Sequence, residues 1–153
     1  MTNTQAQLQQ VFRDNFVAYY RSHVAHANIV GRNFYSDHKL LGKIYEHLQS
    51  NIDVLAELLR TLGEKMPANI GSVIAESAVE DDPCVGTADD MLLQVRDNIQ
   101  QLDSAYQELV VQATDESIDE IADFAQGEIR VLRKYMWFLD STLTPEFMAL
   151  DDL

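Results

Sequence analysis

Four histidines and one pair of carboxylates are the residues of this chain whose types and spacing suit metal binding. The histidines all lie in the first third of the sequence: His23, His26, His38 and His47. Asp53 and Glu57 stand four residues apart, so on a helix they share a face and could bind one cation together. Imidazole and carboxylate ligands together suit Fe(II), with zinc, cobalt or manganese as substitutes. Ordinary surface or core histidines and a solvated acidic pair are the commoner alternatives.

A site that unites two histidines, His26 and His38, with the carboxylate pair cannot form within one chain if that pair lies on the same helix as His38. His38 and Asp53 are fifteen residues apart, which corresponds to about 22 Å of helix. Metal–ligand bonds are only about 2 Å long. A site that uses all four residues therefore takes the histidines from one subunit and the carboxylates from another, as a two-fold pairing allows. The Glu-x-x-His motif of a di-iron site inside a bundle is absent.

Hydrophobic periodicity predicts four long helices that would position these side chains. We expect them over residues 5–30, 35–62, 88–113 and 115–143. Gly31 separates the first two helices. Asn33 or Ser36 is expected to cap the second helix, and Gly63 is expected to end it. Thr87 and Thr114 are expected to cap the third and fourth helices. Residues 63–87 form a long connection that carries a short helix at 69–77.

This pattern predicts an all-α fold in one domain spanning residues 1–153. Two helical hairpins joined by a long crossover define a ferritin-like four-helix bundle, a fold that often holds metal sites. A simple up-and-down bundle without any site would show the same periodicity, so the fold class alone does not establish a function.

Composition narrows the class of protein further. The chain has 153 residues, a formal net charge of −14 and 46% hydrophobic residues, which argues against intrinsic disorder. It has no apolar run long enough for a transmembrane helix, and its N-terminus does not resemble a secretory signal. Cys84 is the only cysteine, which fits a reducing cytoplasm. We therefore expect a cytoplasmic protein without a membrane partner.

Residues 26–57 resemble the signature of the Dps family, the mini-ferritins named after a DNA-binding protein from starved cells. The first half of the signature is present at the family's offsets: His26, Asn28, Gly31, Phe34 and His38. Fifteen residues after the second histidine, Asp53, Ala56 and Glu57 match the family's Asp-x-x-Ala-Glu. Residues 133–139 also resemble the family's last helix, and the resemblance extends over roughly residues 8–143.

The resemblance implies a hollow homododecamer that stores iron and acts as a ferroxidase. Fe(II) would be oxidised at two-fold interfaces, typically by hydrogen peroxide, and the ferric product kept in the cavity, which limits oxidative stress. His26 and His38 would be ligands from one subunit. Asp53 and Glu57 would come from its partner, with Glu57 as the carboxylate common to the iron positions.

Two positions depart from the family pattern. Many members have Trp directly after the first histidine, where this chain has Ala27. Many also have Asp four residues after the second histidine, where this chain has Gly42. A missing acidic ligand could weaken a second iron position. His23, one turn before His26, could compensate as a ligand or proton acceptor, or be an ordinary interface histidine. The alternative function is a structural or DNA-protecting shell with a weakened or silent centre.

The charge distribution bears on the remaining partners. Residues 66–153 carry four basic and nineteen acidic side chains, residues 1–10 carry no basic one, and the tail Asp151–Leu153 is acidic. We therefore expect no appreciable DNA binding, because phosphates would be repelled. Asp119 and Asp123 lie four residues apart near the start of the last helix. In the family, acidic residues there can line three-fold pores through which iron enters.

Overall fold

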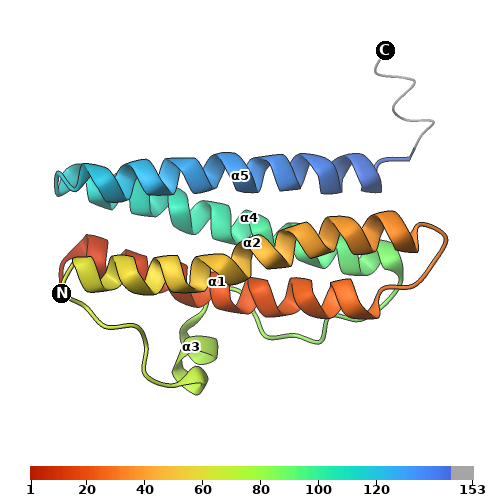
Figure 1. The fold of residues 1–153 in the computed structure, drawn as a ribbon, viewed down its shortest axis with the longest axis horizontal. Coiled ribbons are helices and arrows are strands. Elements are labelled where there is room, and N and C mark those ends of the chain that lie inside the picture. Colours follow the sequence, from red (N-terminus) through yellow and green to blue (C-terminus); the bar gives the residue numbers. More distant parts are fainter. Residues whose placement is uncertain (146–153) are drawn as a thin grey trace, which may run out of the picture.

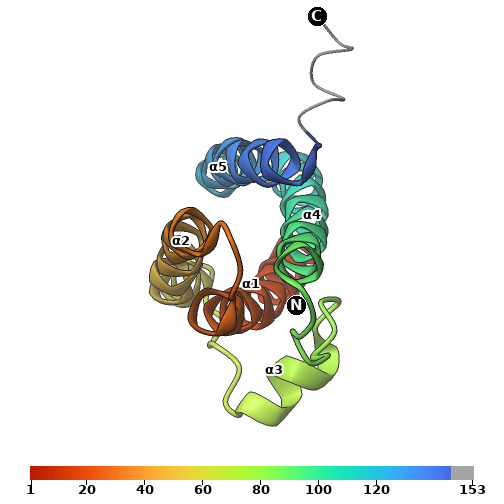
Figure 2. The same cartoon turned by 90° about the vertical axis from the view of Figure 1, so that its right-hand side faces the viewer.

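The computed structural model describes residues 1–145, which form five α-helices (Figure 1). In chain order the helices are α1 (Asn3–Asn28), α2 (Phe34–Thr61), α3 (Ile70–Glu76), α4 (Ala88–Asp115) and α5 (Asp119–Leu143). The four long helices lie side by side as a bundle, and α3 packs outside it against α1 (Figure 2). The described residues contain no strand, so the predicted all-α class is confirmed.

The connectivity is that of two antiparallel hairpins. α1 pairs with α2 and α4 pairs with α5, whereas α2 and α4 run in the same direction (Figure 1). The connection between α2 and α4 must therefore return along the length of the bundle, and it carries α3 on the way. This confirms the predicted crossover and places the expected short helix at Ile70–Glu76.

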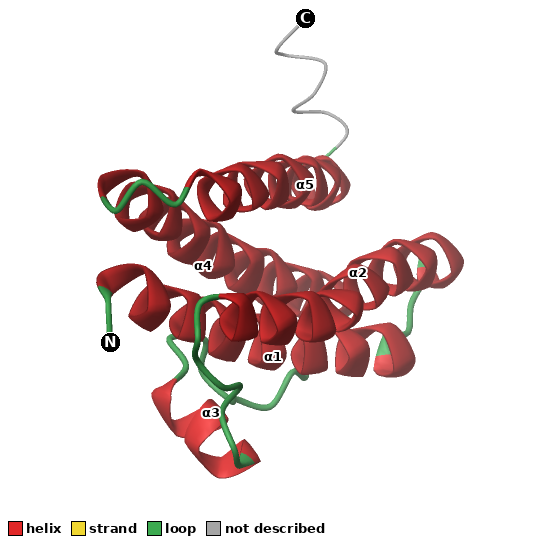
Figure 3. Ribbon diagram, turned by 60° about the vertical axis from the view of Figure 1, so that its left-hand side comes forward, coloured by secondary structure: helices red, strands yellow, loops and turns green. Residues whose placement is uncertain are grey.

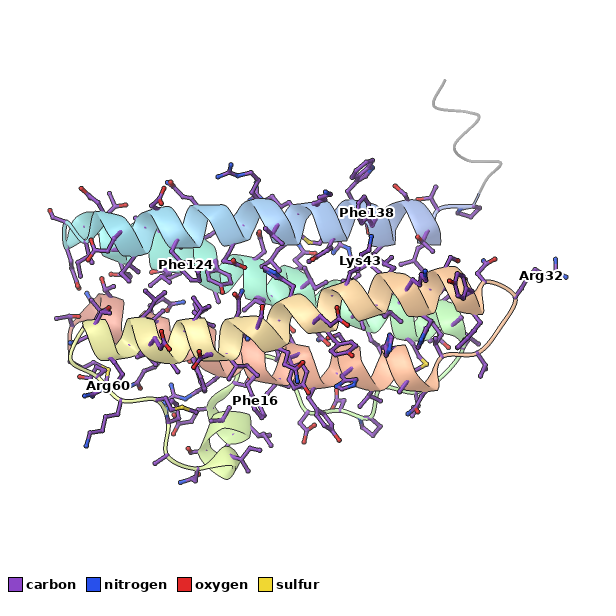
Figure 4. The ribbon with its side chains drawn as sticks, viewed as in Figure 1. Phe16, Arg32, Lys43, Arg60, Phe124 and Phe138 are labelled. Atoms are coloured by element: carbon purple, nitrogen blue, oxygen red, sulfur yellow. The ribbon has the colours of Figure 1, made fainter. Side chains whose placement is uncertain are left out.

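Apolar residues at helical spacing on all four long helices meet in one core. Its largest fully buried side chains include Phe12 from α1, Leu48 and Leu55 from α2, and Tyr106 from α4. α5 contributes the fully buried Leu132, while its Phe124 packs against this core from a half-buried position (Figure 4). The core fixes the rotation of α1 and α2, and so determines which of their side chains face each other.

The predicted helix caps are confirmed only in part. Asn33 precedes α2, but its side chain makes no capping hydrogen bond among the described residues. Thr87 caps α4 as expected, in a reciprocal capping box with Asp90. The prediction that Thr114 caps the last helix was wrong, because α4 continues to Asp115. Ser117 adopts a left-handed conformation with φ 60°, and the Ile118 N–H closes the turn on the Ala113 carbonyl at 2.8 Å. α5 then begins at Asp119.

The first helix is also longer at its start than predicted. It begins at Asn3, where Thr2 and Gln5 form a capping box that the sequence analysis did not recognise, and it ends at Asn28. Glu116, at the end of α4, accepts hydrogen bonds from the N–H groups of Asn3 and Thr4. A carboxylate at a helix N-terminus also interacts favourably with the helix dipole. The C-terminus of α4 thereby stabilises the N-terminus of α1.

The crossover is attached to the bundle through α1 (Figure 3). The buried Asp14 accepts hydrogen bonds from the Ser77 hydroxyl at 3.1 Å and the Ala78 N–H at 2.7 Å. Burial raises the pKa of this carboxyl, although its hydrogen bonds act in the opposite direction. Arg13 pairs with Glu76 at the end of α3. Phe16 lies on the side of α1 that faces α3 (Figure 4).

Within residues 1–145, no helix combines the length and apolarity needed to cross a membrane. The acidic tail Asp151–Leu153, which entered the argument about DNA, lies outside the described residues.

Candidate metal centre

The α1–α2 turn brings His26 and His38 together. Gly31 allows this turn with φ 135°, a value that side chains disfavour. His26 lies in the last turn of α1 and His38 near the start of α2, close to the turn that Arg32 marks in Figure 4. Their rings stack at 3.8 Å between centroids. The positions of His26 and His38, five residues before and seven after Gly31, predict that a hairpin turning there brings the two imidazoles together, and the structure confirms this.

Each imidazole is held by the backbone of the other residue. His26 Nδ1 lies 2.7 Å from the His38 carbonyl oxygen, and His38 Nδ1 lies 2.8 Å from the His26 carbonyl oxygen. A carbonyl only accepts hydrogen bonds, so both Nδ1 atoms must carry the proton. In the neutral ring this leaves the lone pair on Nε2. Neither Nε2 has a hydrogen-bond partner among the described residues, and this is the arrangement that prepares histidine for a metal.

Gly42 provides the space that the His26 ring occupies. A Cβ atom at residue 42 would lie 3.1 Å from His26 Cε1 and 3.2 Å from Nδ1. Such contacts are closer than side chains ordinarily tolerate, so a residue with a side chain would press on the ring. The glycine that departs from the family pattern is therefore coupled to the position of the first histidine.

Asp53 and Glu57 lie together on one exposed face of α2, as their spacing predicts. Neither carboxylate has a hydrogen bond or ion pair with another described residue. No group of three or more His, Cys, Asp or Glu within residues 1–145 is arranged to hold a metal ion. One chain thus presents a histidine pair and a carboxylate pair in separate places, and a site that unites all four stays a prediction.

His23 lies in an aromatic cluster next to the histidine pair. Its Nδ1 is 3.1 Å from the Tyr19 hydroxyl, and its ring stacks on Tyr45 at 3.9 Å with an interplanar angle of 2°. Tyr45 in turn lies 4.9 Å from the His26 ring. The i, i+4 spacing of Tyr19 and His23 was visible in the sequence, whereas the contact of both with Tyr45 depends on how α1 packs on α2.

His47 belongs to a polar cluster inside the bundle that sequence reasoning did not find. Its Nε2 lies 2.8 Å from Glu128 Oε2 on α5, and Asn51 Nδ2 donates to the same oxygen at 2.7 Å. Burial, and then the Glu128 charge, raises the pKa of Tyr106 well above its ordinary value, and that of Tyr135 less strongly. Two residues separated by 81 positions form this pair. The His47–Glu128 pair provides the buried carboxylate with a hydrogen-bond partner, which gives His47 a structural role.

The remaining predicted residues are placed as follows. Asp119 and Asp123 are both exposed near the start of α5, and their assignment to a pore stays a prediction. Trp137 is 62% exposed in the single chain, so it is not a core residue. Cys84 lies within the crossover, where it is buried and free of any disulfide.

Comparison with known proteins places this architecture in a family. The family model described as a ferritin-like domain matches residues 5–146. Antigen TpF1 of Treponema pallidum is 32% identical over 139 residues, covering 90% of this chain and 78% of that protein. The DNA protection during starvation protein of Helicobacter pylori is 24% identical, covering 89% of this chain and 95% of that protein.

Solved structures agree on the fold. Dps from Staphylococcus aureus superposes with a TM-score of 0.88 at 22% identity, covering 94% of this chain and 97% of that one. Dps from Vibrio cholerae, described as a member of a broad superfamily of ferritin-like diiron-carboxylate proteins, gives a TM-score of 0.87 at 20% identity and covers 92% and 89%. The chain belongs to the ferritin-like family and, within it, to the Dps mini-ferritins.

Proposed function

We propose that this protein stores iron in a hollow dodecameric shell and oxidises Fe(II), with hydrogen peroxide, at sites between its subunits. Family membership supports iron storage in general. The observation that carries the finer proposal is the reciprocal bonding of His26 and His38, which leaves both Nε2 atoms available to a metal. A purely structural hairpin has no need for two imidazoles oriented in this way.

The complete site would use residues of two subunits. His26 and His38 come from one subunit, and Asp53 and Glu57 from its two-fold partner, because their separation along α2 forbids a common ion within one chain. Two-fold symmetry then gives two equivalent sites per dimer. Glu57 is the carboxylate that we assign to both iron positions.

Iron is the substrate in this reaction. The two Nε2 atoms and the carboxylates bind Fe(II), and the negative carboxylates stabilise the higher charge of the ferric product. Two Fe(II) ions each give up one electron, and one peroxide takes both electrons and two protons to become two waters. Paired transfer avoids the one-electron reduction that would release a hydroxyl radical.

The charge of the protein favours cations as its partners. The formal charge of −14 per chain attracts Fe(II) and repels DNA. We assign Asp119 and Asp123 to the route by which iron enters, and we place the protein in the cytoplasm. A gel-shift assay at low salt is expected to show no DNA retention, and retention that disappears as salt rises would contradict this part of the proposal.

The test is anaerobic Fe(II) loading followed by a stoichiometric peroxide pulse, with ferric absorbance and particle mass recorded on the same sample. We expect rapid oxidation and retention of iron in particles of dodecameric mass. The double variant His38→Ala/Asp53→Ala should lose the rapid phase. Glu46→Ala, which removes an exposed carboxylate of α2, is the matched control and should keep it.

The alternative shell function makes the opposite prediction. Oxidation no faster than in buffer, and equal in the double variant, would mean that Ala27 and Gly42 mark a silent centre. Binding of Co(II) by the wild type but not by the double variant separates loss of the metal site from loss of the reaction.

A further inference from the structure

A half-buried aromatic cluster on α1 and α2 connects the histidine pair to residues outside the proposed ligand set. It runs from Tyr19 through His23 and Tyr45 to His26, with ring-centroid distances of 5.7, 3.9 and 4.9 Å for the successive steps. His26 then stacks on His38. The rings are therefore in continuous contact from Tyr19 to the candidate metal ligands.

The Tyr19 hydroxyl is the group in this cluster that can release an electron and a proton together. It lies 3.1 Å from His23 Nδ1, and it donates to that nitrogen when His23 carries its ring proton on Nε2. A phenol that loses an electron becomes a strong acid. A base already hydrogen-bonded to the hydroxyl takes the proton without a further rearrangement, which makes the oxidation easier.

The other five tyrosines of the chain lack this arrangement. Tyr20 and Tyr35 are 57% and 67% exposed, and neither hydroxyl bonds to a base in the described structure. Within residues 1–145, the hydroxyl of the buried Tyr106 has no hydrogen bond to a base. Tyr45 and Tyr135 have no hydrogen bond to a base either, so Tyr19 is distinguished by its contacts among the described residues.

We propose that Tyr19 and His23 form a redox-active pair that supplies an electron, through Tyr45, when a site holds only one Fe(II). The proposal rests on the proposed ferroxidase function. Fe(II) gives one electron and Tyr19 gives the second. Hydrogen peroxide takes both, together with two protons from solvent, and its O–O bond breaks to yield two waters. The O–H bond of Tyr19 breaks, its proton moves to His23 Nδ1, and a neutral tyrosyl radical remains.

The pair matters at low iron, where a site lacks the second Fe(II) that would complete peroxide reduction. Without a second donor, one-electron reduction of peroxide would release a hydroxyl radical. With the pair, the oxidising equivalent is held on the Tyr19 side chain as a neutral radical. Tyr19 and His23 are thus assigned to electron and proton transfer, and the substrate is bound by other residues.

The test uses the assembled protein loaded anaerobically with less than one Fe(II) per site and then pulsed with peroxide. Ferric absorbance, peroxide consumption and freeze-quenched electron paramagnetic resonance are recorded together. We expect a tyrosyl signal and one peroxide consumed per iron. Tyr19→Phe, and His23→Phe, which keeps a ring to stack on Tyr45, should lose the tyrosyl signal and release hydroxyl radical, which a spin trap detects. Tyr20→Phe is the matched control and should behave as the wild type.

A second arm keeps the test decisive if iron oxidation itself is absent. Metal-free protein is oxidised by photogenerated ruthenium(III) tris-bipyridine, and the yield of neutral tyrosyl radical is compared among the same variants. Loss of yield in Tyr19→Phe and His23→Phe supports the pair. Equal yields, or iron oxidation in the first arm with no tyrosyl signal, would overturn it. Absence of iron oxidation at every loading would instead refute the proposed function.

Discussion

Gly42 shows how a residue without a side chain can determine the geometry of a metal ligand. The His26 ring fills the space above Gly42, stacks on His38 and donates to its carbonyl. A Cβ atom at this position would already crowd the ring. The glycine therefore leaves the imidazole the space that its hydrogen-bonded position needs.

Substitution of Gly42 by Ala is therefore expected to weaken metal binding. The added methyl group would push on His26 Cε1 and Nδ1 and loosen the hydrogen bond that orients the ring. We expect the Co(II) affinity of the assembled protein to fall by about tenfold, the lower end of what loss of an orienting contact costs. Spectroscopic titration with Co(II) measures this.

Gly127→Ala is the matched control, because a Cβ there would meet nothing within 4 Å. Both substitutions replace a helical glycine by alanine and gain about the same helix propensity, up to ~1 kcal/mol. Only Gly42→Ala should change the affinity. Equal affinities in the two variants would show that His26 does not depend on the space at residue 42.

At the scale of the helices, Glu116 joins the end of α4 to the start of α1. The Thr4 hydroxyl nearby, followed by the N–H groups of Thr4 and Asn3, lowers the pKa of this carboxyl from its ordinary value of 4.5. The unfolded chain therefore binds more protons than the folded one in the window just below 4.5. The stabilisation by Glu116 is complete above that value and is lost as pH falls through the lowered pKa.

Glu116→Gln is expected to lower the melting temperature at pH 7 and to have progressively less effect in acid. The amide cannot provide the negative charge that α1 favours at its N-terminus. Thermal melts of the wild type and the variant should converge as the wild-type carboxylate becomes protonated. A difference that stays constant across this pH range would contradict the assignment of the charge to helix capping.

The crossover depends on the buried Asp14. Its Oδ1 accepts hydrogen bonds from Gln10, Ser77 and the Ala78 backbone. Asp14→Ala leaves the Ala78 N–H without its partner, which costs about 1–3 kcal/mol where such a group is buried. We expect lower stability in chemical denaturation and faster amide hydrogen exchange over residues 70–79.

Arg13→Met serves as the comparison for Asp14→Ala, because it removes the Arg13–Glu76 pair from the same connection. Glu76 is largely exposed, and such surface pairs contribute only about 0–1 kcal/mol. Hydrogen exchange over residues 70–79 should change little. An equal effect of the two variants would mean that α3, and not Asp14, holds the crossover in place.

The sequence alone allowed us to predict contacts that a short turn dictates. His26 and His38 flank Gly31 at similar distances, so an antiparallel hairpin had to bring them together. Glu128 and His47 meet because α2 and α5 pack in a particular rotation, which periodicity does not specify. Thr114 followed by two acids has the pattern of a helix start, but the left-handed Ser117 moves that start to Asp119.

At the scale of the whole molecule, the proposed site can be tested by mixing subunits. Each of His38→Ala and Asp53→Ala alone should inactivate the protein. In a dimer with one subunit of each variant, one site lacks both His38 and Asp53. The other site has both of these ligands. Random reassembly should therefore recover about a quarter of the wild-type rate of iron oxidation.

The controls for mixing are the two variants assembled separately and a mixture of wild type with His38→Ala. The latter should show a rate proportional to the fraction of wild-type subunits. A site built within one chain would make the complementary mixture as inactive as its components. That result would overturn the division of ligands between subunits.

The separation of the histidine pair from the carboxylate pair has a consequence for the newly made chain. A single subunit gathers no group of three ligand side chains within residues 1–145, so it offers iron only incomplete coordination. Under the proposed division, the chemistry begins when two chains dock. Assembly then controls the reaction, because an isolated subunit produces no ferric ion.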